Sequence, residues 1–163
     1  MMRGFGVGAA AVVLLLAGLL TTACTNTGRA VLSDGTEVKF TESEPKVLIP
    51  NRAVPPVGKT AGQLVYVPEC TCFVFLTLGP PDHSYAVWPA GTVGVKSPTP
   101  SVRLPDGRTF ADGTFLEIGA VRLGFQGGNT PFDLPPGKVD FFSRHEALVI
   151  TTAEEIPGPD DDR

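Results

Sequence analysis

The sequence lacks most of the residue patterns on which enzyme and metal sites are built. It has two histidines and three cysteines, and no C-x-x-C pair occurs. There is no G-x-S-x-G nucleophile elbow, and no G-x-G-x-x-G loop links a strand to a helix. These absences disfavour a C-x-x-C redox centre, a serine hydrolase and a phosphate-binding loop, so no catalytic residue and no cofactor are assigned.

Basic charge is also scarce. The chain has 13 lysines and arginines against 17 aspartates and glutamates, which gives a formal net charge of −4. Proteins that bind nucleic acid carry a basic patch or stripe, and this composition provides none. Nucleic acid is therefore not an expected partner.

Long helical patterns are missing as well. No segment carries an apolar stripe at helical spacing over two turns, and the best candidate, Ser143–Leu148, is long enough for a single turn. The chain instead contains 19 glycines and 16 prolines, spread without a period. This usage predicts many turns between short strands.

Short apolar runs follow one another from residue 62 onward. Gly62–Val67, Thr71–Leu78 and Ser84–Trp88 are rich in β-branched and aromatic residues and too short for buried helices, so we expect strands there. The Pro-Asp-Gly triplet at residues 105–107 lies between two further apolar segments and predicts a tight hairpin turn.

These patterns predict an all-β fold. We expect a small antiparallel barrel, OB-like or SH3-like, of about five to seven strands, with a β-sandwich as the alternative. The expected barrel domain covers residues 61–153. A proline-broken tether and N-terminal arm over residues 24–60 precede it, and an acidic tail over residues 154–163 follows it.

The first 23 residues differ from the rest of the chain. Arg3 carries the single charge, and Phe5–Leu20 is an uninterrupted apolar stretch. A basic start, an apolar region and small residues before a cleavage point are typical of a secretory signal peptide, predicted here over residues 1–23. The apolar stretch is slightly shorter than the roughly 20 residues of a spanning helix, and an uncleaved N-terminal anchor is the alternative.

The end of this segment, "LLTTAC" at Leu19–Cys24, resembles the lipobox of bacterial lipoproteins, with Ala23 before the cleavage point. It departs from the usual pattern by having Thr21 where leucine is most common. The resemblance implies that Cys24 receives a diacylglycerol thioether and anchors an extracytoplasmic protein to the cell membrane. The alternative is an ordinary secretory signal in which Cys24 is incidental.

A longer stretch, Gly62–Gly128, resembles uncharacterised small bacterial lipoproteins and secreted proteins. The shared features are a glycine-led first strand, a cysteine-bearing second strand, a "VWP-G" element and a glycine-rich closing strand. This resemblance implies a small β-barrel exported by a lipid-anchored route, and it carries no activity.

Cys70 and Cys72 lie one residue apart at the head of an apolar run. In an oxidising compartment such a pair is first expected to form a disulfide. Residues i and i+2 of a regular strand are too far apart for this, so the bond requires the strand to begin after Cys70. The alternatives are buried thiols, a redox pair, or a Cu(I) or zinc site, the last with His83 and His145 as further ligands.

The remaining candidate is a binding surface formed by His83, Tyr85 and Trp88, although core packing is the favoured interpretation for the aromatic side chains. The predicted function is therefore binding of a cell-envelope protein or a small ligand by a lipid-anchored β domain. A metal-binding or thiol-redox module at Cys70 and Cys72 is the alternative, and a purely structural envelope component is a third.

Overall fold

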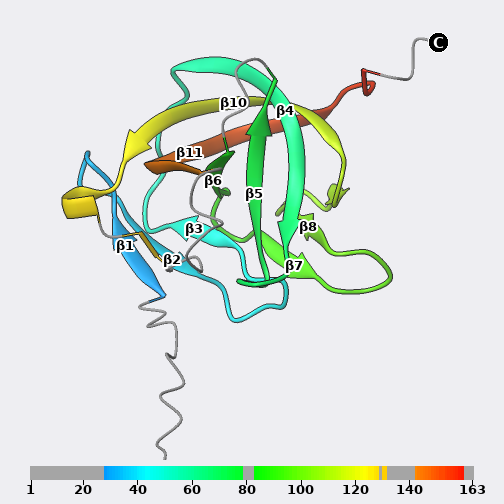
Figure 1. Ribbon diagram of the computed structural model, residues 1–163, viewed down its shortest axis with the longest axis horizontal. Helices are drawn as coiled ribbons and strands as arrows, with labels where there is room; N and C mark the ends of the chain where they lie inside the picture. Colours follow the sequence, from blue (N-terminus) through cyan, green and yellow to red (C-terminus); the bar gives the residue numbers. More distant parts are fainter. Residues whose placement is uncertain (1–27, 79–82, 129, 132–141, 160–163) are drawn as a thin grey trace, which may run out of the picture.

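The computed structural model describes residues 28–78, 83–128, 130–131 and 142–159, without the side chains of residues 142–145 (Figure 1). The described residues form an all-β protein, as the sequence predicts. Their strands are β1 (Arg29–Val31), β2 (Glu37–Phe40), β3 (Leu48–Pro50), β4 (Gly58–Val67), β5 (Cys72–Thr77), β6 (His83–Val87), β7 (Val93–Val95), β8 (Ser101–Arg103), β9 (Thr109–Ala111), β10 (Phe115–Gly124) and β11 (Phe142–Glu155). A short 3-10 turn, η1 (Gln126–Gly128), follows β10.

The strands form one large and one small sheet. The large sheet has eight strands in the order β1-β2-β3-β6-β11-β10-β4-β5, and it curls back on itself because β5 also pairs with β6. The small sheet consists of β7, β8 and β9. β6 runs parallel to both β3 and β11, so the large sheet is mixed. The sequence predicted a purely antiparallel arrangement, whereas this sheet is mixed; the all-β fold with two sheets is consistent with the sandwich alternative.

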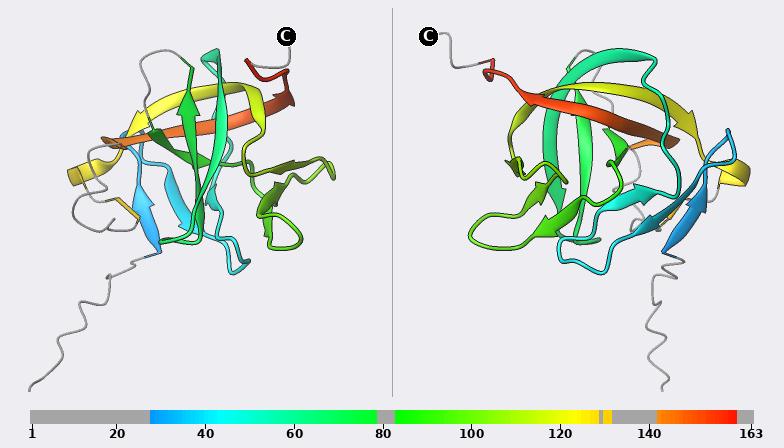
Figure 2. Two further views of the ribbon diagram at one scale, coloured as in Figure 1. Left: turned by 45° about the vertical axis from the view of Figure 1, so that its right-hand side comes forward. Right: turned by 180° about the vertical axis from the view of Figure 1, so that it is seen from behind.

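The small sheet lies beside the strands β4, β5, β6, β10 and β11, which we call the central strands (Figure 2). One hydrophobic core lies between them. We call it the central core. Trp88 and Phe75 are its largest fully buried side chains. Val102, Leu104 and Phe110 reach it from β8, β9 and the turn between them, so the small sheet covers one side of the central strands.

A second core lies under the N-terminal arm, which we define as residues 28–57 with β1, β2 and β3. This arm core contains Leu32, Val38 and Leu48 from the arm. Tyr85 and Phe125 meet them from the other side, with ring centroids 5.3 Å apart in an edge-to-face arrangement. The arm is therefore packed on the central strands as part of the same sheet.

β6 and β11 are buried on both faces because they separate the two cores. Successive residues of β6 alternate, with Tyr85 and Val87 in the arm core and Ala86 in the central core. β11 does the same, with Val149 in the arm core and Ile150 in the central core. Near-continuous apolar runs of this kind are typical of strands covered on both sides.

Strands also form in the segment expected to be a tether and N-terminal arm. The tether and arm predicted over residues 24–60 contain three strands of the large sheet, and residue 61 falls inside β4. Ser143–Leu148, the best helical candidate in the sequence, belongs to β11. Its pairing with β10 on one side and β6 on the other outweighs any local helical preference.

Candidate functional site

A disulfide joins Cys70 and Cys72 at the tip of the β4–β5 hairpin, with their Cα atoms 5.2 Å apart. β5 begins at Cys72, and Cys70 lies in the preceding turn. This is the arrangement that the sequence argument required for a bond at this spacing. Cys70 is half-buried, whereas Cys72 is 2% exposed and belongs to the arm core.

The residue inside the disulfide ring, Thr71, has an unusual backbone. Its φ is +51°, which makes it the one residue other than glycine with a positive φ in the described part of the chain. A β-branched side chain is strongly disfavoured in this region. Two hydrogen bonds hold the peptide there: Thr71 N–H donates to the Pro68 carbonyl at 3.1 Å, and Lys46 N–H donates to the Thr71 carbonyl at 2.6 Å.

The disulfide contributes little net stability, because two opposing effects are of similar size. Closing a loop of about three residues lowers the entropy of the unfolded chain by an amount worth about 1.6 kcal/mol. Holding a non-glycine residue at positive φ costs about 1–3 kcal/mol. The gain in the unfolded state and the cost at Thr71 thus offset each other to within a few kcal/mol.

The structure does not support the metal hypothesis for this pair. Metal ligation needs thiolates, and both sulfur atoms are used in the disulfide. His83 pairs with Leu76, four residues beyond Cys72, which places it about 13 Å further along the sheet. The side chain of His145 lies outside the described residues. Among those that are described, no three histidine, cysteine, aspartate or glutamate side chains are grouped to hold a metal ion.

The binding surface predicted from His83, Tyr85 and Trp88 is wrong for its two aromatic members. Trp88 is fully buried in the central core, and Tyr85 is 4% exposed and packs in the arm core. The reason is that β6 lies between two cores, so a side chain on either face is covered. His83, at the start of β6, is half-buried.

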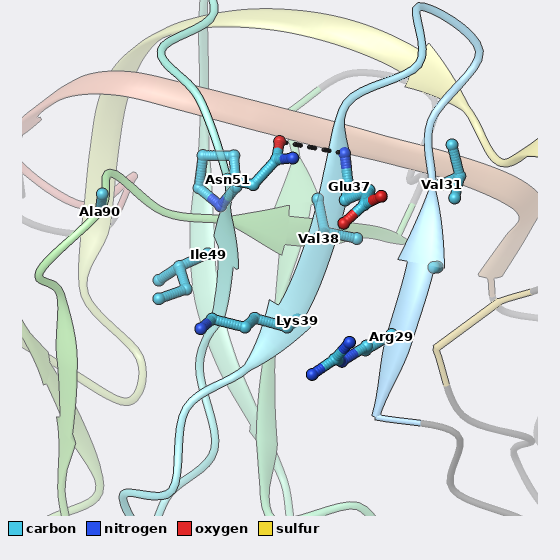
Figure 3. Close-up of a pocket in the computed structure, with 10 residues that line it drawn as sticks. Arg29, Val31, Glu37, Val38, Lys39, Ile49, Asn51 and Ala90 are labelled. Carbon is cyan, nitrogen blue, oxygen red and sulfur yellow. Dashed lines mark hydrogen bonds between the residues drawn. The ribbon is translucent and has the colours of Figure 1, made fainter.

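The outer face of the arm instead carries a groove with a volume of about 650 Å³ (Figure 3). Its lining comes from β1, β2, β3 and the loop after β6. It combines the charged side chains of Arg29, Lys39 and Glu37 with the apolar ones of Val31 and Ile49. Figure 3 shows the basic groups of Arg29 and Lys39 at one end and Glu37 beside Asn51 at the other.

Strand register explains this arrangement. Arg29 faces Lys39 across β1 and β2, and Lys39 faces Ile49 across β2 and β3. Alternate residues of a strand point to opposite faces. Ala30, Val38 and Leu48 therefore enter the arm core, while Arg29, Val31, Glu37, Lys39 and Ile49 line the groove.

The end of the groove near Asn51 is braced by hydrogen bonds. Asn51 forms two of them with the backbone of Glu37. The Asn51 side-chain oxygen accepts from the Glu37 N–H at 3.2 Å, and the Asn51 backbone N–H donates to the Glu37 carbonyl at 2.8 Å. In the β1–β2 turn, Asp34 accepts hydrogen bonds from the backbone and hydroxyl of Thr36, each at 2.9 Å. Arg52 donates to Asp34 Oδ2 at 3.0 Å and to Thr36 Oγ1 at 2.9 Å.

These contacts set the pKa of Asp34. Partial burial raises the pKa of this carboxyl group, but the hydrogen bonds from Thr36 and the positive charge of Arg52 outweigh the burial. The pKa of Asp34 therefore lies below its usual value. The charged carboxylate of Asp34 is therefore the form that joins the β1–β2 turn to Arg52, which follows β3.

The sequence argument did not identify the groove, whose strands lie in the segment expected to be a tether and N-terminal arm over residues 24–60. The available signal was the alternation at Glu37–Phe40 and Lys46–Pro50, which is too short to distinguish a strand from an extended linker. The predicted lipidation site, Cys24, and the predicted signal peptide, 1–23, lie outside the described residues. In the part of the chain that the structure covers, no helix has the length and apolar character needed to cross a membrane.

Comparison of the chain with protein-family models, with curated proteins and with solved structures finds no match.

Proposed function

We propose that this protein is a lipid-anchored extracytoplasmic lipoprotein whose β domain binds a small amphiphilic anion in the arm groove. The observation that supports the binding site is the groove itself, where apolar side chains adjoin two opposed basic side chains. Its volume of about 650 Å³ lies in the usual range of small-molecule sites. The anchor is supported by the lipobox-like segment that ends at Cys24.

Charge favours an anionic ligand. Residues 28–54 carry four basic and four acidic side chains, whereas residues 55–163 carry eight basic and thirteen acidic ones. An anion is therefore repelled least at the arm, and within the groove Arg29 and Lys39 lie directly opposite each other. Val31 and Ile49 would contact the apolar part of the ligand.

The groove is tested with phenyl phosphate, a small apolar ring with an anionic group. The full-length protein in an uncharged detergent is titrated by calorimetry, together with Lys39→Gln and Lys39→Glu. We expect affinity to fall about tenfold in Lys39→Glu and less in Lys39→Gln, since a charge-assisted hydrogen bond is lost. Lys59→Gln, at an exposed lysine of β4, serves as the control. Equal binding of phenyl phosphate by all variants would reject the groove as the site. Binding of a cell-envelope protein without binding of phenyl phosphate would favour the protein partner instead.

The anchor is tested separately by metabolic labelling with a clickable fatty acid. The wild-type protein should carry the label and Cys24→Ala should lose it. Label that persists in Cys24→Ala would refute lipidation at this position, whatever the outcome at the groove.

A further inference from the structure

The Cys70–Cys72 disulfide has two features that a purely structural bridge does not need. It encloses a single residue, and that residue is the β-branched Thr71 at a φ of +51°. Opening the ring releases the covalent constraint that helps to keep Thr71 in this conformation. Strain in the oxidised form favours reduction, and strained or accessible disulfides are the ones that exchange with thiols.

The two sulfur atoms differ in access. Cys70 is half-buried and follows two exposed residues, Pro68 and Glu69, whereas Cys72 is 2% exposed within the arm core. An incoming thiolate can therefore reach Cys70 and not Cys72. This asymmetry defines which sulfur is attacked first and which leaves.

The strands on either side of the ring are held by pairing that does not depend on the bond. Val67 pairs with Cys72 across β4 and β5, and Lys46 forms a backbone bridge with Cys72 and donates to the Thr71 carbonyl. The rings of Tyr66 and Phe73, with centroids 5.4 Å apart, pack next to this pair. Reduction would thus leave the two cysteines close together, ready to form the bond again.

We propose that the Cys70–Cys72 disulfide is a thiol-exchange site that oxidises external dithiols. A thiolate of the dithiol attacks Sγ of Cys70, the Cys70–Cys72 bond breaks, and Sγ of Cys72 leaves and takes up a proton. The second thiolate then attacks the first sulfur of the dithiol in the mixed disulfide and releases Cys70. Two thiols become one disulfide, and the two electrons reside on the reduced cysteine pair. This activity is independent of the ligand proposed for the arm groove.

The experiment measures how readily the bond is reduced. The oxidised full-length protein is equilibrated with dithiothreitol at defined ratios of reduced to oxidised reagent. Differential alkylation and mass spectrometry of the peptide that contains Cys70 and Cys72 give the reduced fraction, so Cys24 does not interfere. In Thr71→Gly, where a positive φ carries no penalty, we expect the equilibrium to shift about tenfold toward the disulfide.

Matched variants separate exchange from a structural role. Thr109→Gly, at an exposed threonine of β9, should leave the equilibrium unchanged. The double variant Cys70→Ser, Cys72→Ser should not oxidise dithiothreitol, while its thermal unfolding midpoint should stay within a few degrees of the wild type. An equilibrium that Thr71→Gly does not shift, or wild-type protein that fails to oxidise an equimolar amount of dithiothreitol, would overturn the proposal.

Discussion

The central core and the arm core share β6 and β11 but differ in how they are closed. The central core contains Trp88 and Phe75 and is covered by the small sheet, which Arg108 ties to β11 through a hydrogen bond to the Ala153 carbonyl at 2.6 Å. The arm core is covered by three short strands that end in turns and charged contacts. The proposed ligand groove lies on the arm, over the smaller of the two cores. Regions of lower local stability are where binding sites are commonly found.

The largest effect is expected from Phe75→Ala in the central core. Phe75 is fully buried, and truncation of a buried phenylalanine costs about 3–5 kcal/mol. Because Trp88 is the single tryptophan and lies in the same core, its fluorescence during urea unfolding reports the loss directly. A loss below about 1 kcal/mol would mean that the central core does not dominate the stability of the fold.

Leu32→Ala probes the arm core in the same way. Leu32 is fully buried, and its truncation should cost about 2–4 kcal/mol. We expect faster amide hydrogen exchange in β1, β2 and β3, while β4 and β10 stay protected. Leu78→Ala, at a side chain that is 52% exposed, is the control. Equal loss of protection in both regions would show that the two cores unfold as one unit.

Gly94→Ala tests the contact between the arm and the small sheet. A Cβ atom on Gly94 would overlap the Pro45 carbonyl oxygen, so the arm and β7 would have to move apart. We expect a loss of about 1–3 kcal/mol in urea unfolding. Gly58→Ala, where a Cβ meets no atom within 4 Å, should change stability much less. Similar losses in both variants would contradict a tight contact at Gly94.

The smallest effect is expected at Asp34. Its carboxylate stabilises the β1–β2 turn, and Asp34→Asn should cost about 1 kcal/mol at pH 7. The pKa of Asp34 is lowered in the folded protein, so its contribution is complete above the unfolded pKa of about 3.9 and is lost as pH falls through the folded value. The difference between wild type and Asp34→Asn should therefore shrink in acid. A difference that is constant from pH 7 to pH 2 would exclude this origin.

The sequence predicted the local features of the fold well. The triplet at residues 105–107 marks the turn between β8 and β9, and the need for a strand that begins after Cys70 agrees with β5 starting at Cys72. Both conclusions depend on geometry within a few residues, which sequence alone specifies.

The features that were missed depend on pairing between distant segments. The parallel pairing of β6 with β3 and β11 buries both of its faces, and nothing near Trp88 in the sequence signals this. Trp88 precedes a proline, which is also compatible with an exposed strand end. The arm strands are three or four residues long, so their alternation is too brief to reveal the face that carries Lys39 and Ile49.

The position of β1 has a consequence for the proposed anchor. β1 begins at Arg29, five residues after Cys24. A chain of five residues spans at most about 17 Å, so a lipid on Cys24 would hold Arg29 within that distance of the membrane surface. This short connection would hold the groove close to the membrane surface. Ligands attached at the level of the lipid headgroups would then be present at high effective concentration, whereas ligands fixed further from the membrane would not contact the groove.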